Sequence, residues 1–199
     1  MVKDNARKQV ALLLADGFEE GEAVIVLDIL ERLEIQVTTL ACQKSLTLRT
    51  YHGIQMQAYA LLSAQGDRLF DAVFMHGGPE GSVALAVSKD VGEFVRRHDE
   101  AGKLICPLCS AAARVLGGNG LLKGRRYVCS GDLYKDVKDG VYVNQSFVED
   151  GNLLSGKGLG LAFDFAFQLA YRLTGNAEAT NFQADHIDYH HWRADQKLL

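Results

Sequence analysis

Three short stretches of this sequence are dominated by apolar residues, and each is followed at once by a turn or a helix signal. They are residues 9–15, 71–76 and 103–108. A strand that is buried on both faces has such a continuous apolar run, whereas a strand with one solvated face alternates apolar and polar residues. Because doubly buried strands need helices on both sides, these runs predict a parallel sheet inside an α/β protein.

The segments between these runs show the helical period that such a fold requires. Residues 21–34 place Val26, Ile29 and Leu33 on one side of a helix, and a strand follows at 35–41. This unit implies parallel strands joined by a right-handed crossover. The whole pattern predicts a doubly wound, flavodoxin-like sandwich with a mostly parallel central sheet. The other expected elements are a hairpin at 46–50 and 54–59, helices at 90–101, 110–116 and 158–174, and strands at 126–129, 141–148 and 152–155.

The length of 199 residues suits a single domain spanning residues 1–199, in which we expect 176–199 to form a polar, solvated C-terminal extension. A formal charge of −4 and dispersed basic residues give no electrostatic reason to bind nucleic acid or an anionic membrane. No apolar run approaches the roughly 18 residues that span a bilayer, and the start has no signal-peptide pattern. We therefore expect a cytoplasmic protein with no membrane or nucleic-acid partner.

The chain has four cysteines, Cys42, Cys106, Cys109 and Cys129, too few for a disulfide scaffold in a chain of this length. Cys109 stands out because it lies between the expected strand 103–108 and a predicted helix. A helix N-terminus favours an anion and lowers a thiol pKa from about 8.5, which would make Cys109 a nucleophilic thiolate. The alternative is an inert cysteine packed in a strand-to-helix turn.

Two other features fall at the ends of predicted strands, where open parallel sheets bind ligands. Glu22 lies on the same helical stripe as Val26 and Ile29, and a carboxylate on an apolar face is costly unless it is paired or protonated. A raised pKa would let Glu22 share a proton with a thiolate, although an exposed first-turn glutamate is an equal alternative. Gly77 and Gly78 would allow N–H groups to approach a developing oxyanion, or they form a simple glycine turn.

The chain resembles the ThiJ/PfpI superfamily, in the branch of the Parkinson-disease-associated protein deglycase, from about residue 9 to residue 175. The motifs that carry the resemblance are ADGFEEGE at 15–22, YHG at 51–53, FMHGG at 74–78, ICPLCSA at 105–111, GLLKGRR at 120–126 and SGKGLG at 155–160. The resemblance implies that Cys109 is a nucleophile-elbow cysteine with Glu22 as its carboxyl partner. It also implies that Gly77, Gly78, Ser110, His52 and Lys157 bind the oxyanion or the substrate.

The function implied by the resemblance is that of a cofactor-free, metal-free glyoxalase or deglycase acting on small 2-oxoaldehydes such as methylglyoxal. The implied oligomer is a homodimer, with part of the segment 17–28 near the interface. The alternative is a redox-sensing stress-response or chaperone-like protein that uses oxidation of Cys109 to a sulfinate. Both hypotheses depend on one site, so the sequence does not separate them.

Three departures from the family pattern bear on the chemistry. Ser130 occupies the position where this branch often has a histidine, so the motif supplies no Cys-His dyad. Ser110 follows the cysteine where the protease-like branch has a histidine, which argues against peptidase activity. His76 replaces the usual proline before the glycine pair, and Pro107 stands at the start of the elbow.

Three other sequence patterns suggest a disulfide, a metal site or a functional stripe, and each has a simpler structural explanation. Cys106 and Cys109 have CxxC spacing, but three residues of a strand extend about 10 Å, beyond the roughly 7 Å limit for a disulfide. His186, His190 and His191 have the spacing of metal ligands, but a solvated surface is the simpler expectation. Asp164, Gln168 and Arg172 recur every four residues, which indicates a solvent-facing stripe on a largely buried helix.

Overall fold

A computed structural model of the chain describes residues 7–194. Its main sheet contains β1 (Gln9–Leu14), β2 (Gln36–Ala41), β5 (Ala60–Leu61), β6 (Ala72–Met75), β7 (Leu104–Pro107), β10 (Phe147–Asp150) and β11 (Leu153–Gly156). The strands lie in the order β10-β11-β7-β6-β1-β2-β5. Every neighbouring pair is parallel except β10 and β11 at one edge. The expected mostly parallel α/β sandwich is confirmed.

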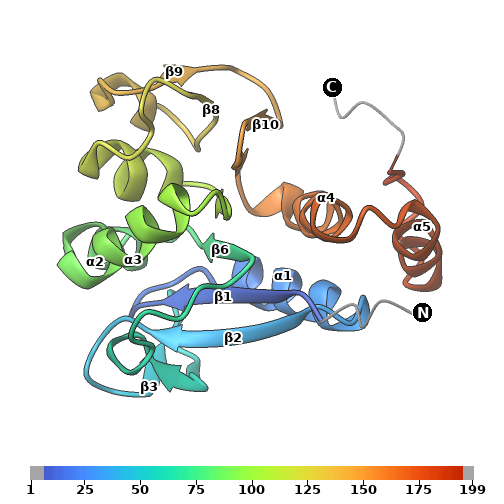
Figure 1. The fold of residues 1–199 in the computed structure, drawn as a ribbon, viewed down its shortest axis with the longest axis horizontal. Helices are drawn as coiled ribbons and strands as arrows, with labels where there is room; N and C mark the ends of the chain where they lie inside the picture. The colour runs from blue at the N-terminus through green and yellow to red at the C-terminus, as the bar shows by residue number, and fades with distance from the viewer. Residues whose placement is uncertain (1–6, 195–199) are drawn as a thin grey trace.

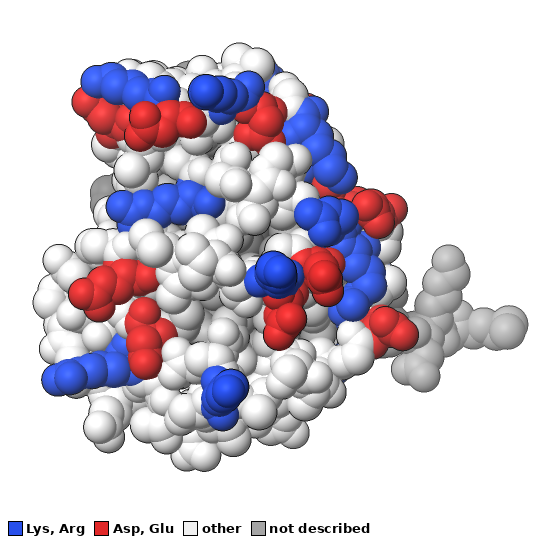
Figure 2. Space-filling model, turned by 90° about the vertical axis from the view of Figure 1, so that its left-hand side faces the viewer, with Lys and Arg blue, Asp and Glu red and all other residues white. Residues whose placement is uncertain are grey.

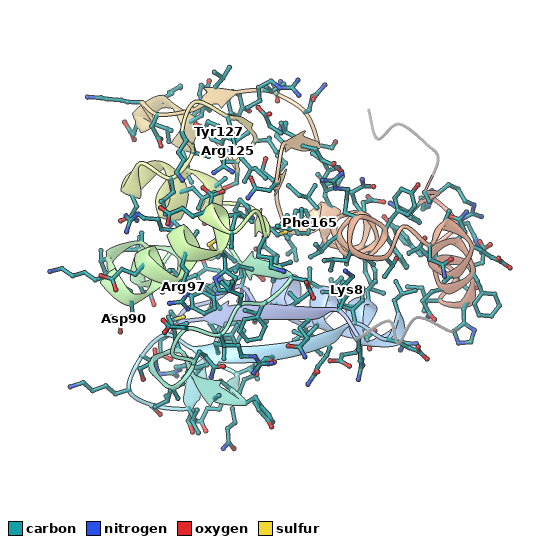
Figure 3. All side chains as sticks on the ribbon, in the orientation of Figure 1. Lys8, Asp90, Arg97, Arg125, Tyr127 and Phe165 are labelled. Carbon is teal, nitrogen blue, oxygen red and sulfur yellow. The ribbon has the colours of Figure 1, made fainter. Side chains whose placement is uncertain are left out.

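Helices cover both faces of this sheet (Figure 1). The α-helices are α1 (Glu20–Arg32), α2 (Gly81–Val87), α3 (Lys89–Glu100), α4 (Ala162–Thr174) and α5 (Ala177–His186). Alternate residues of β1 point to opposite faces, so Leu12 packs in the core with α1 and α4, and Leu13 packs in the core with α2 and α3. On the α4 side lies Phe165, which is labelled in Figure 3. Its ring centroid is 5.8 Å from that of Phe74 in β6. The continuous apolar runs thus reflect burial of these strands on both faces, as the sequence predicts.

The irregular parts of the chain differ more from expectation. The hairpin is confirmed as β3 (Thr47–Arg49) and β4 (Gln55–Gln57). The strand expected at 141–148 is instead divided into β9 (Val141–Tyr142), which pairs with β8 (Arg126–Tyr127), and β10 in the main sheet. The polar residues at 144–146 form the break, because their side chains favour turns. Short 3₁₀ segments lie at Leu62–Ala64, Gly117–Asn119, Leu133–Asp136 and Leu159–Leu161, and Ala112–Leu116 is a π-helix.

The C-terminal segment is not the solvated extension expected from its polarity. Helix α5 packs beside α4, and Trp192 beyond it is fully buried. The Trp192 ring stacks on Phe167 of α4 at 5.2 Å, and Tyr189 stacks on Phe163 at 5.1 Å. A few widely spaced apolar residues are enough to anchor a segment that is otherwise polar. The part of this prediction that concerns residues 195–199 lies outside the described residues.

The stripe on α4 is also less exposed than expected. Asp164 is half-buried, and burial raises its pKa although the neighbouring Tyr189 hydroxyl opposes the rise. Gln168 donates to Glu149 of β10, and Arg172 forms an ion pair with the same carboxylate at 3.2 Å. The three residues therefore attach α4 to neighbouring segments instead of simply facing water, because their polar groups pair with groups that the sequence period does not reveal.

The order of strands reverses at β1, since β2 lies on one side of it and β6 and β7 lie on the other. The carboxyl ends of β1, β6 and β7 therefore meet at the switch point, the usual ligand site of such sheets. On the side where α2 and α3 lie, acidic and basic side chains are interspersed (Figure 2). Among residues 7–194 no helix has the length and apolar character needed to cross a membrane.

Candidate active site

Cys109 occupies a sharp turn directly after β7. Its φ of +61° lies in the left-handed region, which is unfavourable for a residue with a Cβ. Two backbone hydrogen bonds hold this conformation: the Cys109 amide donates to Gly156 O at 2.9 Å, and the Ser130 amide donates to Cys109 O at 3.1 Å. The surrounding backbone thus imposes the turn that a nucleophile elbow requires, and the thiol is left half-buried.

Glu22 is fully buried in the first turn of α1. Its Oε2 accepts a hydrogen bond of 2.6 Å from the Gly77 amide, which follows β6. Its other oxygen, Oε1, is buried and has no hydrogen-bond partner among the described nitrogen and oxygen atoms. The Cys109 thiol approaches the carboxyl closely enough to perturb its pKa. The apolar-face position inferred from the sequence is therefore real, and half of the carboxyl lacks a permanent partner.

Glu22 and Cys109 titrate as a pair. Burial raises the pKa of Glu22 from 4.5 to about 7, although the hydrogen bond from Gly77 opposes the rise. Burial and the negative charge of Glu22 raise the pKa of Cys109 to about 11. Between these two values the pair holds one negative charge and one proton, which the carboxyl and the thiol share.

The sequence-based expectation of a lowered thiol pKa at Cys109 is therefore wrong. The residues after the elbow form a π-helix instead of a regular α-helix, and burial beside a carboxylate outweighs the favourable N–H groups. The Ser130 hydroxyl and the Ser110 amide do lower the pKa of Cys109 by hydrogen-bonding the thiolate, but they act against larger causes. A thiolate forms here most readily when its proton passes to Glu22.

Glycine is required at both positions of the Gly77-Gly78 turn. A Cβ on Gly77 would lie 2.6 Å from Cys109 Cβ and 3.0 Å from Glu22 Oε2. Gly78 has a φ of +93°, and a Cβ there would lie 2.5 Å from Gly17 O. Among residues 7–194, no oxygen acceptor takes the Gly78 or Ser110 amide proton. Both N–H groups therefore lack an oxygen partner, and the Gly77-Gly78 turn borders the thiol, an arrangement that suits an oxyanion-binding site.

His76, which replaces the usual proline, lies beneath this turn. The ring is fully buried, and its Nδ1 hydrogen-bonds Gly77 O. Burial lowers the pKa of His76 to about 4, so the ring is neutral at ordinary pH. Because a carbonyl only accepts, Nδ1 carries the proton and donates it to Gly77 O. The departure from the family pattern therefore supplies a hydrogen bond that a proline would lack.

The other two predicted site residues lie further out. His52 is exposed and hydrogen-bonds Glu20 at 2.8 Å, and no hydrogen bond in the described structure joins it to Cys109 or Glu22. Lys157 donates to Asn144 Oδ1 at 2.7 Å. Its neighbour Gly158 borders the thiol, because a Cβ at Gly158 would lie 3.9 Å from Cys109 Sγ. The structure therefore separates His52 from Cys109. Lys157 is the neighbour in sequence of Gly158, which borders the Cys109 thiol.

Within residues 7–194, Glu19, Glu20 and His52 form the one group whose potential metal-ligand atoms all lie within 4.8 Å of one another. Glu19 and Glu20 are half-buried, and His52 is exposed. His190 instead pairs with Asp185 at 3.0 Å.

Cys106 is fully buried below the elbow, and burial raises its pKa far above the ordinary value. All four cysteines are free thiols.

Two residues beside the thiol were not predicted as site residues. Ser130 hydrogen-bonds Cys109 from a segment that is distant in sequence, and Gly158 borders the sulfur from the start of the α4 segment. Gly158 belongs to the SGKGLG motif, and Ser130 stands where this branch often has a histidine. Their proximity depends on loop paths, which periodicity does not specify.

Comparison with known proteins identifies the family and the fold of this chain. The model of the DJ-1/PfpI family matches residues 8–172. Protein dj-1beta of Drosophila melanogaster is 32% identical over 174 residues, which cover 84% of this chain and 90% of the relative. Protein DJ-1 homolog B of Arabidopsis thaliana is 31% identical over 88% of this chain, but this chain spans only 40% of its length.

A relative with a named activity and a solved structure extend the comparison. The relative is the glutathione-independent glyoxalase DJR-1.2 of Caenorhabditis elegans, 28% identical over 88% of this chain and 94% of that protein. The structure is that of a cysteine-to-alanine mutant of a DJ-1 superfamily protein from Salmonella typhimurium. It has a TM-score of 0.90 and 60% identity, and the match covers 92% of this chain and 98% of that one.

Proposed function

The chain belongs to the DJ-1/PfpI family, and from that premise we propose that it is a cofactor-independent glyoxalase or deglycase acting on small 2-oxoaldehydes or their adducts. The proposal rests on the buried Glu22 carboxyl beside the Cys109 thiol, next to the Gly78 and Ser110 amides that have no oxygen partner among the described residues. A relative named as a glutathione-independent glyoxalase supports the same reaction class. Members of this family are commonly dimeric.

The first step uses the Cys109 sulfur as nucleophile. Glu22 takes the thiol proton, and the thiolate adds to the aldehyde carbon of methylglyoxal, so that a C–S bond forms and the carbonyl π electrons move to oxygen. The Gly78 and Ser110 amides stabilise this oxyanion. Protonation by Glu22 then gives a neutral hemithioacetal and returns the carboxyl to its anionic form.

The second step moves a proton between adjacent carbons. The Glu22 carboxylate removes the hydrogen from the carbon bonded to sulfur, and the electron pair of that C–H bond moves onto the ketone oxygen, giving an enediolate and a protonated Glu22. Glu22 then returns this proton to the neighbouring carbon, and the hydroxyl proton on the carbon bonded to sulfur passes to the former ketone oxygen, so that a thioester carbonyl forms. The product is a thioester of lactate on Cys109. Water hydrolyses this thioester, releasing lactate and regenerating the thiol. A carboxyl with a pKa of about 7 suits this role, because it both gives and takes a proton near neutral pH.

Lactate production from methylglyoxal by the wild type and by Cys109→Ala tests the proposal. We expect production by the wild type and none above background by Cys109→Ala. Cys42→Ala is a matched control, since Cys42 is a free thiol on a separate part of the sheet, and it should retain activity. Equal lactate production by Cys109→Ala and the wild type would contradict the proposal. No turnover by the wild type, together with ready oxidation of Cys109 to a sulfinate, would favour the redox-sensing alternative.

We also propose a homodimer in which part of the segment 17–28 lies near the two-fold interface, because isologous dimers are the commonest oligomers. Light scattering at micromolar concentration tests this proposal. A mass twice that of the 21.8 kDa chain is expected, and a monomeric mass would contradict it.

A further inference from the structure

Ser82 lies beneath the two free amides and contacts the residues that supply both of them. It is the second residue of α2 and is fully buried. Its hydroxyl donates to Gly78 O at 2.7 Å, and Ser110 Oγ donates to Ser82 Oγ at 2.9 Å. Gly78 follows β6 and Ser110 follows the elbow after β7. One side chain thus connects the two loops that meet at the thiol.

The hydrogen positions in this cluster follow from the chemistry of the groups. Gly78 O only accepts, so the single hydroxyl proton of Ser82 points to it. The two lone pairs of Ser82 are then free to accept, and they take hydrogen bonds from Ser110 Oγ and from Arg114 Nη1, at 2.9 and 3.0 Å. Ser82 therefore uses its whole hydrogen-bonding capacity, which fixes its rotamer.

Arg114 completes the connection from the opposite side. It lies in the π-helix after the elbow, and its Nη1 also donates to Pro79 O at 2.8 Å. The Arg114 amide in turn donates to Ser110 O at 3.0 Å. The elbow side and the glycine-turn side are thereby joined through Ser82 and through Arg114. A charged donor strengthens the hydrogen bond that Ser82 accepts.

We propose that Ser82 is a positioning residue that holds the Gly78 and Ser110 loops together, so that their two amides act as one oxyanion-binding pair. Catalytic hydrogen bonds must hold their geometry closely, and a misplacement of about 1 Å costs roughly 100-fold in rate. Ser82 does not contact the reacting atoms. This inference rests on the proposed function for its reaction, but its geometry is independent of which carbonyl compound binds.

Three variants of Ser82 separate the hydroxyl from the space it fills. Ser82→Ala removes the hydroxyl, Ser82→Cys keeps a group of similar size with a weak donor, and Ser82→Thr keeps the hydroxyl. We expect kcat for methylglyoxal to fall about 10- to 100-fold in Ser82→Ala and Ser82→Cys, with KM changed less than threefold, and to fall less in Ser82→Thr. The matched control is Thr180→Val, since the buried Thr180 hydroxyl makes the same bond to a carbonyl four residues earlier, in α5.

Alkylation of Cys109 by iodoacetamide distinguishes positioning from collapse of the site. This displacement reaction develops no oxyanion, so its rate should stay within about twofold of wild type in Ser82→Ala. A loss of kcat with an unchanged alkylation rate supports the inference. Unchanged kcat in Ser82→Ala, or equal losses in kcat and alkylation rate, would overturn it.

Protection of Cys109 by methylglyoxal provides a readout that does not require turnover. A reversible hemithioacetal blocks alkylation, and its stability depends on the amide pair. If the wild type shows protection without lactate formation, the proposed function fails, and weaker protection in Ser82→Ala still supports the role of Ser82. Equal protection in the wild type and Ser82→Ala, or none in either, would overturn the inference.

Discussion

Two buried carboxylates of this protein, Glu22 and Asp99, differ in how many hydrogen-bond partners they have. Glu22 has one oxygen on the Gly77 amide and one without a partner, and burial raises its pKa to about 7. The Asp99 side chain is only 6% exposed, but both of its oxygens are paired with neighbouring donors. These donors are Lys123 Nζ at 2.7 Å, Arg125 Nη1 at 2.8 Å and Asn152 Nδ2 at 2.9 Å.

The difference in partners decides the charge of each group. Burial also disfavours the Asp99 anion, but the hydrogen bonds from Lys123, Asn152 and Arg125 outweigh it and lower the pKa of Asp99. Asp99 thus stays ionised and ties α3 to the segment that carries Arg125 and Tyr127 (Figure 3). Glu22 keeps an exchangeable proton. Complete pairing makes a structural carboxylate, and incomplete pairing leaves a carboxyl available for proton transfer.

Activity should depend on Glu22 far more than on other carboxylates of the protein. Glu22→Gln keeps the shape and a donor but removes proton transfer, so turnover of methylglyoxal should fall at least ~100-fold. Asp28→Asn, which changes an exposed carboxylate on the same helix, is the control and should leave turnover unchanged. Steady-state kinetics measure both. Near-normal turnover in Glu22→Gln would mean that the unpartnered carboxyl has no catalytic role.

The free energy of unfolding should depend strongly on the paired carboxylate of Asp99. Asp99→Asn weakens the bonds to Arg125 and Lys123 in a largely buried site, and we expect it to reduce the free energy of unfolding by about 2 kcal/mol. Asp132→Asn removes an exposed ion pair with Lys135 and should change it by less than about 1 kcal/mol. Urea unfolding measures both variants. Equal effects would show that the pairing of Asp99 adds nothing beyond a surface contact.

The same comparison predicts opposite pH dependences of stability. The folded pKa of Glu22 is raised, so its contribution is fully present below pH 4.5 and is lost as pH rises toward about 7, a difference of about 3 kcal/mol. The folded pKa of Asp99 is lowered, so its contribution is present above the unfolded value of 3.8 and is lost as pH falls below it. Glu22→Gln should flatten the neutral part of the stability profile and Asp99→Asn the acidic part. The reverse assignment would contradict both pKa directions.

A polar contact of the C-terminal segment should contribute only modestly to stability. Tyr189→Phe removes the hydroxyl that interacts with the Asp164 carboxyl but keeps the ring stack on Phe163, so it should lower the free energy of unfolding by about 1 kcal/mol. Tyr59→Phe, at a tyrosine that is 82% exposed, is the control. If both changes are neutral in urea unfolding, the packing of this segment adds little to stability.

The sequence predicts the regular parts of this structure well, because burial on both faces leaves a direct mark on residue type. The apolar runs locate β1, β6 and β7, and the order of elements predicts that their ends meet. Residue type does not predict the packing of the C-terminal segment. Trp192 is one buried residue in a polar stretch, and only its contact with Phe167 reveals that the segment packs.

The candidate site is predictable in part for a similar reason. Cys109, Glu22 and Gly77 stand at strand ends or on an apolar stripe, which the sequence shows. Ser82 and Ser130 reach the site through loops, and their roles depend on hydrogen bonds between distant segments. The sign of the Cys109 pKa shift was also beyond reach, because it depends on how burial and the Glu22 charge compare with nearby donors.

Glu22 and Cys109 are expected to titrate as one unit, and the pH dependence of Cys109 alkylation measures this coupling. The charge and hydrogen bond of Glu22 help to raise the thiol pKa to about 11. Alkylation by iodoacetamide, followed by peptide mass spectrometry, should therefore show a lower apparent pKa of Cys109 in Glu22→Gln than in the wild type. The variant should react faster near neutral pH even though its turnover falls. An unchanged pH profile in Glu22→Gln would show that the two groups do not share a proton and would contradict the account.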